Sequence, residues 1–264
     1  MLIALASVKG SPGVTTFAVA LAAAWPSPAR RMLVEADPSG GDLGVRFGLP
    51  ATPGLVSLTA AARTSRDPEL VWQHAWPLPT GVPAVAGPPS AEQARAALAT
   101  SPPTVDDPGP LVLAGNQLNA VVFLDCGRLD PGSPTMPLIA VADALLILTH
   151  AHADALAHLA ARFDTVGRWS HRPALLLVGG GHSAAEVRRE LGAPVLTHIP
   201  HDPRSAAALC GRPTSRRPRV RSPLASSARQ VARALLRDDE PAPVQHPGGE
   251  DGADTRAALT TGRS

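Results

Sequence analysis

The stretch LIALASVKGSPGVTT occupies residues 2–16 and combines three local patterns. An apolar run at residues 2–7 is followed by a glycine-containing turn at residues 10–13, and an alanine-rich segment begins at residue 15. These patterns predict a buried strand, a tight loop and a helix that extends to residue 24. In that order, the backbone N–H groups of the loop and the helix N-terminus converge on one point and attract an anion. The stretch therefore predicts a phosphate-binding loop.

Short apolar runs and helical stretches alternate along the chain that follows. Further strands are predicted at residues 31–36, 82–86, 121–124, 144–149, 174–178 and 195–199. Further helices are predicted at residues 55–63, 90–99, 153–166, 184–191 and 224–237, with Ser90 as an N-cap. Continuous apolar strands that alternate with helices favour a parallel sheet covered on both faces. We therefore expect one α/β domain over residues 1–237, a three-layer sandwich with a mainly parallel sheet of about seven strands.

The composition excludes several classes of protein. The two cysteines, Cys126 and Cys210, cannot form a disulfide framework or complete a structural zinc site, and we expect Cys126 to be packed inside. No uncharged apolar run reaches the roughly 18 residues that mark a membrane span, and the N-terminus lacks the pattern of a signal peptide. We expect a cytoplasmic protein, recruited by a partner when it acts at the inner face of the membrane, without direct membrane insertion.

The last residues differ in composition from the rest. Residues 238–264 are acidic and rich in Pro and Gly, and their only large apolar residues are Val244 and Leu259. Such a segment cannot bury enough apolar surface to offset the entropy of ordering it. We therefore predict a disordered tail.

Lysine is almost absent from this chain. Of 24 basic residues, only Lys9 is a lysine. An ammonium on a flexible stem is a compact point charge that fits beside a phosphate, whereas a guanidinium is a wide planar fork. Lys9 is therefore a candidate phosphate contact, although chance survival in an arginine-biased chain is the alternative.

Residues 9–16 resemble the deviant Walker A loop of the MinD/ParA family of P-loop ATPases, Lys-Gly-Gly-x-Gly-Lys-Thr-Thr. Ser11 replaces a glycine, and Val14 stands where the family has its phosphate-binding lysine. Losing that ammonium removes a charge-assisted contact worth about 1.5–3 kcal/mol. The resemblance implies ATP or ADP binding with Mg²⁺, weakened by Val14, and slow or absent ATP hydrolysis. The nucleotide-binding residues that it implies in the loop are Lys9, Gly10, Ser11, Pro12, Gly13, Val14, Thr15 and Thr16.

Later stretches follow the order of the same family. Residues 35–41 resemble its first switch, in which Asp37 would face the attacking water, although Glu35 and Gly41 depart from the pattern. Residues 121–127 resemble its Walker B strand, which implies that Asp125 holds Mg²⁺ together with the Thr15 hydroxyl. The family's equivalent of Lys9 reaches across a face-to-face homodimer, so the resemblance makes Lys9 a second catalytic candidate beside Asp37.

The end of the domain resembles the family's adenine-binding turn. This likeness implies that Pro200 and Asp202 border the base. Residues 179–181 are all glycine where the family has an asparagine that reads the base, so base recognition is expected to be weak.

Residues 78–98, with Gly87-Pro88-Pro89-Ser90 before a predicted helix, resemble the TadZ/CpaE branch or its actinobacterial MinD-like relatives. This implies a homodimeric switch that localises a pilus or secretion assembly ATPase or other polar machinery. The alternative is an active ParA-type partitioning ATPase that binds nonspecific DNA through a basic run, although we favour a solvated loop there. That run comprises Arg212, Arg216, Arg217, Arg219 and Arg221. Amide-forming synthetases of the same fold need the P-loop lysine and a second-substrate pocket, and neither is visible.

Overall fold

The computed structural model describes residues 1–26, 28–100, 102–104, 106–166, 168–212 and 222–239. In these residues eight strands form one sheet in the order β3-β4-β2-β5-β1-β6-β7-β8. The strands are β1 (Leu2–Ser7), β2 (Arg30–Glu35), β3 (Trp76–Pro77), β4 (Pro83–Val85), β5 (Ala120–Arg128), β6 (Ala144–His150), β7 (Pro173–Val178) and β8 (Val195–Ile199). All neighbours pair in parallel except β3, which is antiparallel to β4. The predicted mainly parallel sheet is confirmed, and the added strand is the two-residue β3, too short to show a periodicity.

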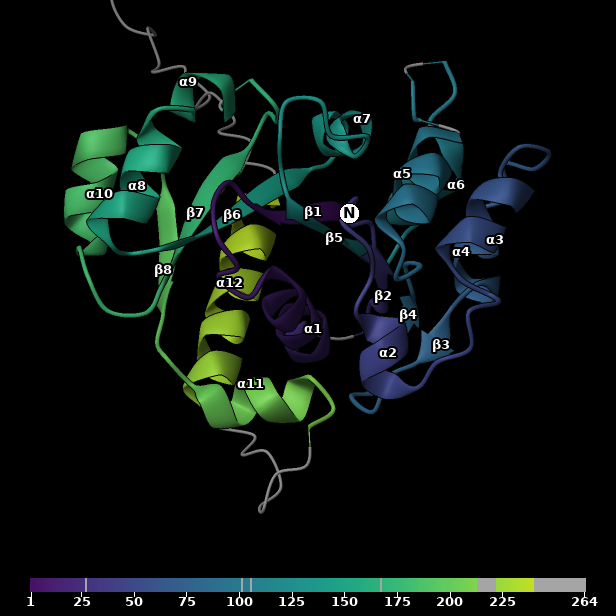
Figure 1. Ribbon diagram of the computed structural model, residues 1–264, viewed down its shortest axis with the longest axis horizontal. Helices are drawn as coiled ribbons and strands as arrows, with labels where there is room; N and C mark the ends of the chain where they lie inside the picture. The colour runs from purple at the N-terminus through teal and green to yellow at the C-terminus, as the bar shows by residue number, and fades with distance from the viewer. Residues whose placement is uncertain (27, 101, 105, 167, 213–221, 240–264) are drawn as a thin grey trace, which may run out of the picture.

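Helices cover both faces of the sheet (Figure 1). On one face, α1 and α12 pack side by side with α2 and α11 nearby. These helices are α1 (Val14–Ala24), α2 (Leu43–Phe47), α11 (Pro203–Leu209) and α12 (Pro223–Asp239). The other face carries α3 (Leu55–Ala61), α4 (Glu69–Gln73), α5 (Ala91–Thr100), α6 (Gly109–Gly115), α7 (Met136–Ala140), α8 (Ala153–Ala160), α9 (Phe163–Val166) and α10 (Ala184–Leu191).

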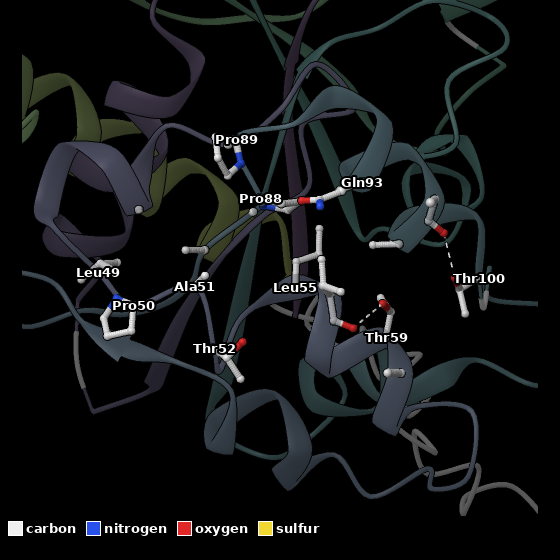
Figure 2. A pocket seen from close by; sticks show the side chains of 18 of the residues that line it. Leu49, Pro50, Ala51, Thr52, Leu55, Thr59, Pro88, Pro89, Gln93 and Thr100 are labelled. Atoms are coloured by element: carbon white, nitrogen blue, oxygen red, sulfur yellow. Dashed lines mark hydrogen bonds between the residues drawn. The ribbon is translucent and has the colours of Figure 1, made fainter.

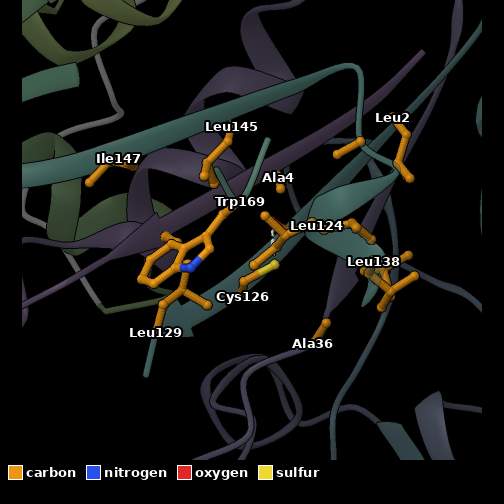
Figure 3. Packing of buried hydrophobic residues seen from close by; sticks show 14 of the residues in the cluster. Leu2, Ala4, Ala36, Leu124, Cys126, Leu129, Leu138, Leu145, Ile147 and Trp169 are labelled. Carbon is orange, nitrogen blue, oxygen red and sulfur yellow. Dashed lines mark hydrogen bonds between the residues drawn. The ribbon is translucent and has the colours of Figure 1, made fainter. Parts of the chain in front are cut away.

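The central strands are apolar along their whole length because both faces are covered. In β1, Leu2 and Ala4 belong to the core cluster under α3–α10, whereas Ile3 and Leu5 belong to the cluster under α1 and α12. Figure 3 shows the first cluster around Cys126. Cys126 is fully buried, which confirms its expected place in the core, and burial raises the pKa of its thiol well above the usual range.

The helix predictions hold where the pattern is long and fail where it is short. Ser90 lies just before α5, and its Oγ accepts a hydrogen bond from the Gln93 N–H at 3.3 Å, as its expected capping role requires. The helix predicted at residues 153–166 is two helices, α8 and α9. The sequence did not reveal α2, α4, α6, α7 and α11, which have five to seven residues each. So few residues define no helical periodicity.

The predicted end of the domain lies close to the end of α12, which reaches Asp239. Residues 240–264 of the predicted tail lie outside the described residues. No helix among the described residues has the length and apolar character needed to cross a membrane.

The sheet places the candidate site residues at one edge. In a parallel sheet the carboxyl ends of the strands lie together, and ligands bind in the crevice outside them. Glu35 at the end of β2 is in register with Asp125 of β5, and the loop after β1 lies at the same edge.

Candidate functional site

The loop between β1 and α1 forms a cradle of backbone N–H groups. Gly10 and Gly13 have φ values of 71° and 93°, a conformation that side chains with a Cβ rarely adopt. Gly13 is the N-cap of α1, no described side chain caps it, and the first turn of this helix carries no acid. The first N–H groups of α1 are therefore available to an anion.

The predicted loop residues differ in exposure. Lys9, Gly10 and Ser11 are exposed, and Lys9 pairs with no other described residue. Val14, which the sequence resemblance aligns with a lysine, is buried in the core cluster under α1 and brings no charge to the loop. Thr15 lies in the first turn of α1, close to Asp125.

Asp125 supplies a buried oxygen beside the cradle. Its Oδ1 accepts a hydrogen bond from Gly127 N at 3.2 Å, whereas Oδ2 has no hydrogen-bond partner among the described residues. Burial raises the pKa of Asp125 to about 6, and the neighbouring Thr15 hydroxyl partly offsets this rise. An unsatisfied buried carboxylate oxygen next to a hydroxyl is a set of hard oxygen donors, which Mg²⁺ prefers. These residues fit a magnesium ion.

Asp37 lies beside the end of β5. Its Oδ1 accepts a hydrogen bond from Ser39 N at 2.7 Å, and burial raises its pKa. A side chain at Gly127 would overlap the Asp37 carboxylate, so the glycine makes room for it. Asp37 is near enough to Asp125 that its charge adds to the rise in the pKa of Asp125.

Glu35 anchors the segment that carries Asp37. Its carboxylate is 1% exposed and accepts hydrogen bonds from the backbone N–H groups of Asp42 at 2.6 Å, Leu43 at 3.0 Å and Gly87 at 3.0 Å. Burial, and then the charge of Asp125, raise the pKa of Glu35 to about 8, while the three N–H donors act against this rise. The sequence marks Glu35 only as a departure from the family pattern, because its partners are backbone N–H groups, which no side-chain motif reveals.

A cavity of about 200 Å³ adjoins the cradle. It brings together six of the predicted nucleotide-binding residues: Ser11, Pro12, Gly13, Thr16, Pro200 and Asp202. Both carboxylate oxygens of Asp202 accept hydrogen bonds from backbone N–H groups: Oδ1 from Ser205 at 3.2 Å and Oδ2 from Leu224 at 3.4 Å. Asp202 therefore also connects α11 to α12. Lys9, Gly10, Val14 and Thr15 do not line this cavity.

The structure adds residues that sequence reasoning missed. The Thr16 hydroxyl lies 3.3 Å from Cys210 Sγ, and Arg46 Nη1 donates to the same sulfur at 3.4 Å. The Arg46 charge also lowers the pKa of Asp125 against the larger effect of burial. A cation from α2 therefore lies near the first turn of α1. No local signal marks Arg46 or Cys210, because α1, α2 and α11 meet only in the folded chain.

Two histidines also line the cavity beside the cradle. They are His150, at the end of β6, and His201, in the turn after β8. The signal that could have found His150 is its place at the carboxyl end of a parallel strand, where ligands bind.

Comparisons with known proteins show the fold but no close relative. No protein-family model matches the sequence, and no curated protein is significantly similar to it. The cell division ATPase MinD of Pyrococcus furiosus is 18% identical over 89% of this chain and 98% of that chain, with a TM-score of 0.67. A ParA family ATPase from Chlorobium tepidum is 14% identical over 88% of this chain and 98% of that chain, with a TM-score of 0.67. The septum site-determining protein MinD from Pyrococcus horikoshii, complexed with Mg-ADP, is 16% identical over 90% of this chain and 97% of that chain, with a TM-score of 0.66.

This chain has the MinD/ParA fold. The predicted P-loop NTPase-like sandwich is thus confirmed at the level of the fold. Within the MinD/ParA fold of this protein, the cradle, Asp37 and Asp125 meet at the carboxyl edge of β1, β2 and β5. Of the basic run at residues 212–221, only the exposed Arg212 is described.

Proposed function

We propose that this protein is a nucleotide-binding switch of the MinD/ParA kind that binds ATP or ADP with Mg²⁺. The observation that carries the proposal is the N-terminus of α1, which no described side chain caps, beside the Oδ2 of Asp125, which has no hydrogen-bond partner in the part of the chain that the structure describes. Two structures of this fold support it by what they contain, the Mg-ADP complex of Pyrococcus horikoshii MinD and an ATP complex of Cyanothece McdA.

Each candidate residue has a role in this proposal. The N–H groups from Gly10 to Thr16 bind the phosphates, and the Thr15 hydroxyl with Asp125 holds Mg²⁺, which neutralises phosphate charge. Asp37 orients the attacking water. The base lies in the cavity that Pro200 and Asp202 line.

The same residues predict slow hydrolysis. Val14 supplies no charge to the phosphates, and charge stabilisation is the main contribution of a protein to phosphoryl transfer. We infer that the output of this protein is a change of surface on nucleotide binding rather than rapid turnover.

Calorimetric titration with MgATP and MgADP tests nucleotide binding. We expect Val14→Lys to tighten MgATP binding by about tenfold, which corresponds to about 1.4 kcal/mol. We expect Asp125→Asn to weaken binding in the presence of Mg²⁺, whereas Asp130→Asn, on an exposed residue soon after β5, leaves it unchanged. No binding by the wild type together with no gain in Val14→Lys would contradict the proposal.

The partner is proposed from the sequence resemblance to the TadZ/CpaE branch. A homodimer around nucleotide would localise a pilus or secretion assembly ATPase. Another protein of this fold, MinD of Aquifex aeolicus, is found in a complex with MinC, which shows that the fold can present a partner surface. Binding of a purified assembly ATPase with MgATP but not with MgADP would support this partner class, and equal binding in both states would contradict it.

A partitioning ATPase is the second candidate. The ParA family ATPase of Chlorobium tepidum has this fold, and the arginines of residues 212–221 are suitable phosphate contacts. Nonspecific duplex DNA should then retain the protein in an ATP-dependent and salt-sensitive way. Retention that is unchanged by Arg216→Ala with Arg217→Ala would eliminate this candidate.

A further inference from the structure

A larger cavity lies between α3 and α5, away from the cradle (Figure 2). Its volume is about 670 Å³, within the range of about 300–1,000 Å³ that is typical of small-molecule sites. Its lining includes the buried Leu55 of α3 and Ala97 of α5, together with Pro88 and Pro89. We call this cavity the α3–α5 cleft.

The walls of the α3–α5 cleft are mostly apolar. Thr52, Thr59 and Thr100 line it, and two of these hydroxyls are used within their own helices: that of Thr59 donates to Val56 O at 3.1 Å and that of Thr100 donates to Ala96 O at 2.7 Å (Figure 2). Val45 and Val56 line the cleft and remain 75% and 47% exposed. Covering these side chains with an apolar group removes apolar surface from water, which is favourable.

One positive charge borders this apolar surface. The Arg63 guanidinium lines the cleft and forms no hydrogen bond or ion pair with a described residue, and none of the described lining residues is an acid. The Gln93 side chain, on the opposite wall, also has no hydrogen-bond partner among the described residues. Arg63 is therefore free to pair with an anion, and Gln93 can donate a further hydrogen bond to it.

We propose that the α3–α5 cleft binds a small anionic amphiphile, a molecule with an apolar body and one carboxylate. The apolar body covers Leu55, Val56 and Ala97, and the carboxylate pairs with Arg63. The volume, and Arg63 as the one cation among the described lining residues, favour such a molecule over an uncharged apolar peptide, which would leave the guanidinium unpaired.

The cleft is connected to the nucleotide site through the backbone. Gly87, in the cleft lining, donates to Glu35 Oε2 at 3.0 Å, and Gly41 N donates to Pro88 O at 2.8 Å. A Cβ on Gly41 would overlap Glu35 and Gly87 O, so these segments are closely packed. A ligand that contacts Pro88 should therefore stabilise the segment that carries Asp37. This coupling rests on the proposed nucleotide function, whereas ligand binding does not.

Titration of the full chain with decanoate, without nucleotide, tests the site. We expect one decanoate per chain, and about tenfold weaker binding for Arg63→Gln, the loss expected for one charge-assisted contact. Arg95→Gln, on an exposed α5 residue outside the cleft, is the matched control. Decanol, which has the same chain but no charge, should bind more weakly and should not respond to Arg63→Gln.

Filling the cleft gives an independent readout. Ala60 and Ala96 are exposed residues on opposite walls, so a tryptophan at either position fills the space without entering the core. We expect Ala60→Trp and Ala96→Trp to abolish decanoate binding while circular dichroism shows a folded chain. Decanoate binding that survives both variants, or that Arg63→Gln leaves unchanged, would overturn the proposal.

A second titration separates this proposal from the proposed function. Decanoate should change the affinity for MgATP, and MgATP should change the affinity for decanoate by the same factor. Decanoate binding without any MgATP binding would refute the nucleotide function and leave the cleft proposal intact. Independent binding of both ligands would overturn the coupling.

Discussion

Position 14 defines the chemistry of the loop at the scale of single residues. Val14 is apolar and buried, so under the proposed function another residue supplies the charge that a lysine would bring to the phosphates. One candidate is Arg46, whose guanidinium donates to Cys210 Sγ, the sulfur that also contacts the Thr16 hydroxyl, and to Asp42 Oδ2 at 2.5 Å. Its charge acts on Asp125, the proposed magnesium ligand.

Arg46→Ala should therefore weaken MgATP binding by about tenfold, the loss of about one charge-assisted contact. Arg189→Ala, on an exposed residue of α10, is the control and should bind as the wild type does. Calorimetry measures both affinities, and thermal melts check that the variants fold. Equal MgATP affinity in the two variants would show that Arg46 is not a phosphate contact.

Glu35 predicts a pH dependence of stability. The folded chain holds the Glu35 proton up to about pH 8, whereas an ordinary glutamate with a pKa of 4.5 releases it earlier. Because the unfolded state then binds fewer protons, the free energy of unfolding should fall as pH rises from about 4.5 to about 8. Asp125, with a pKa of about 6, adds to the fall in the lower part of this range.

Glu35→Gln should remove the contribution of this carboxyl to the pH dependence, so the free energy of unfolding, measured with urea, should change less with pH than in the wild type. It should also lower stability by about 1–3 kcal/mol, because the amide nitrogen cannot accept from the N–H groups that the carboxylate binds. Glu92→Gln, on an exposed α5 residue, should keep the wild-type profile. A Glu35→Gln profile as steep as that of the wild type would contradict the prediction.

Among the elements, α12 carries an apolar stripe that is buried against the rest of the protein. Leu224, Val231 and Leu235 are each at most 5% exposed and belong to the core cluster under α1. The stripe covers the sheet and packs beside α1. It is therefore not free to lie on a membrane.

Two neighbouring leucines in α12 provide a matched test. Leu235 is 2% exposed and Leu236 is 36% exposed. Leu235→Ala should lower the free energy of unfolding by about 2–4 kcal/mol, because it leaves a cavity under α1. Leu236→Ala should cost about 0.5 kcal/mol, as for most surface changes. Chemical denaturation measures both, and similar losses would show that α12 does not pack as described.

At the scale of the whole molecule, Lys9 is exposed and pairs with no other described residue. If it reaches a partner's nucleotide, as the family resemblance implies, its loss affects assembly more than folding. MgATP should raise the mass in solution from the 27.1 kDa of one chain to that of a dimer, and Lys9→Ala should remain a monomer. Light scattering measures the mass, with Arg189→Ala as the control. A Lys9→Ala dimer formed at the wild-type MgATP concentration would refute this role.

Much of the architecture is visible in local patterns. Apolar runs located the seven longer strands because both faces of the sheet are covered, and the glycines at 10 and 13 marked the cradle because they adopt positive φ. Asp37 and Asp125 could be placed at the carboxyl edge because each follows or ends an apolar run. The two-residue β3 and the five short helices could not be located from the sequence, because each is held by packing and has no hydrophobic pattern of its own.

Local order along the chain thus specified the α/β class, the loop that opens α1 and the missing charge at Val14. Packing alone brought Arg46 and Cys210 to Thr16, set Glu35 among the N–H groups of Asp42 and Gly87, and opened the cleft between α3 and α5. The reason is that hydrophobic periodicity records which face of a segment is buried, but it carries no information about which distant segment covers that face.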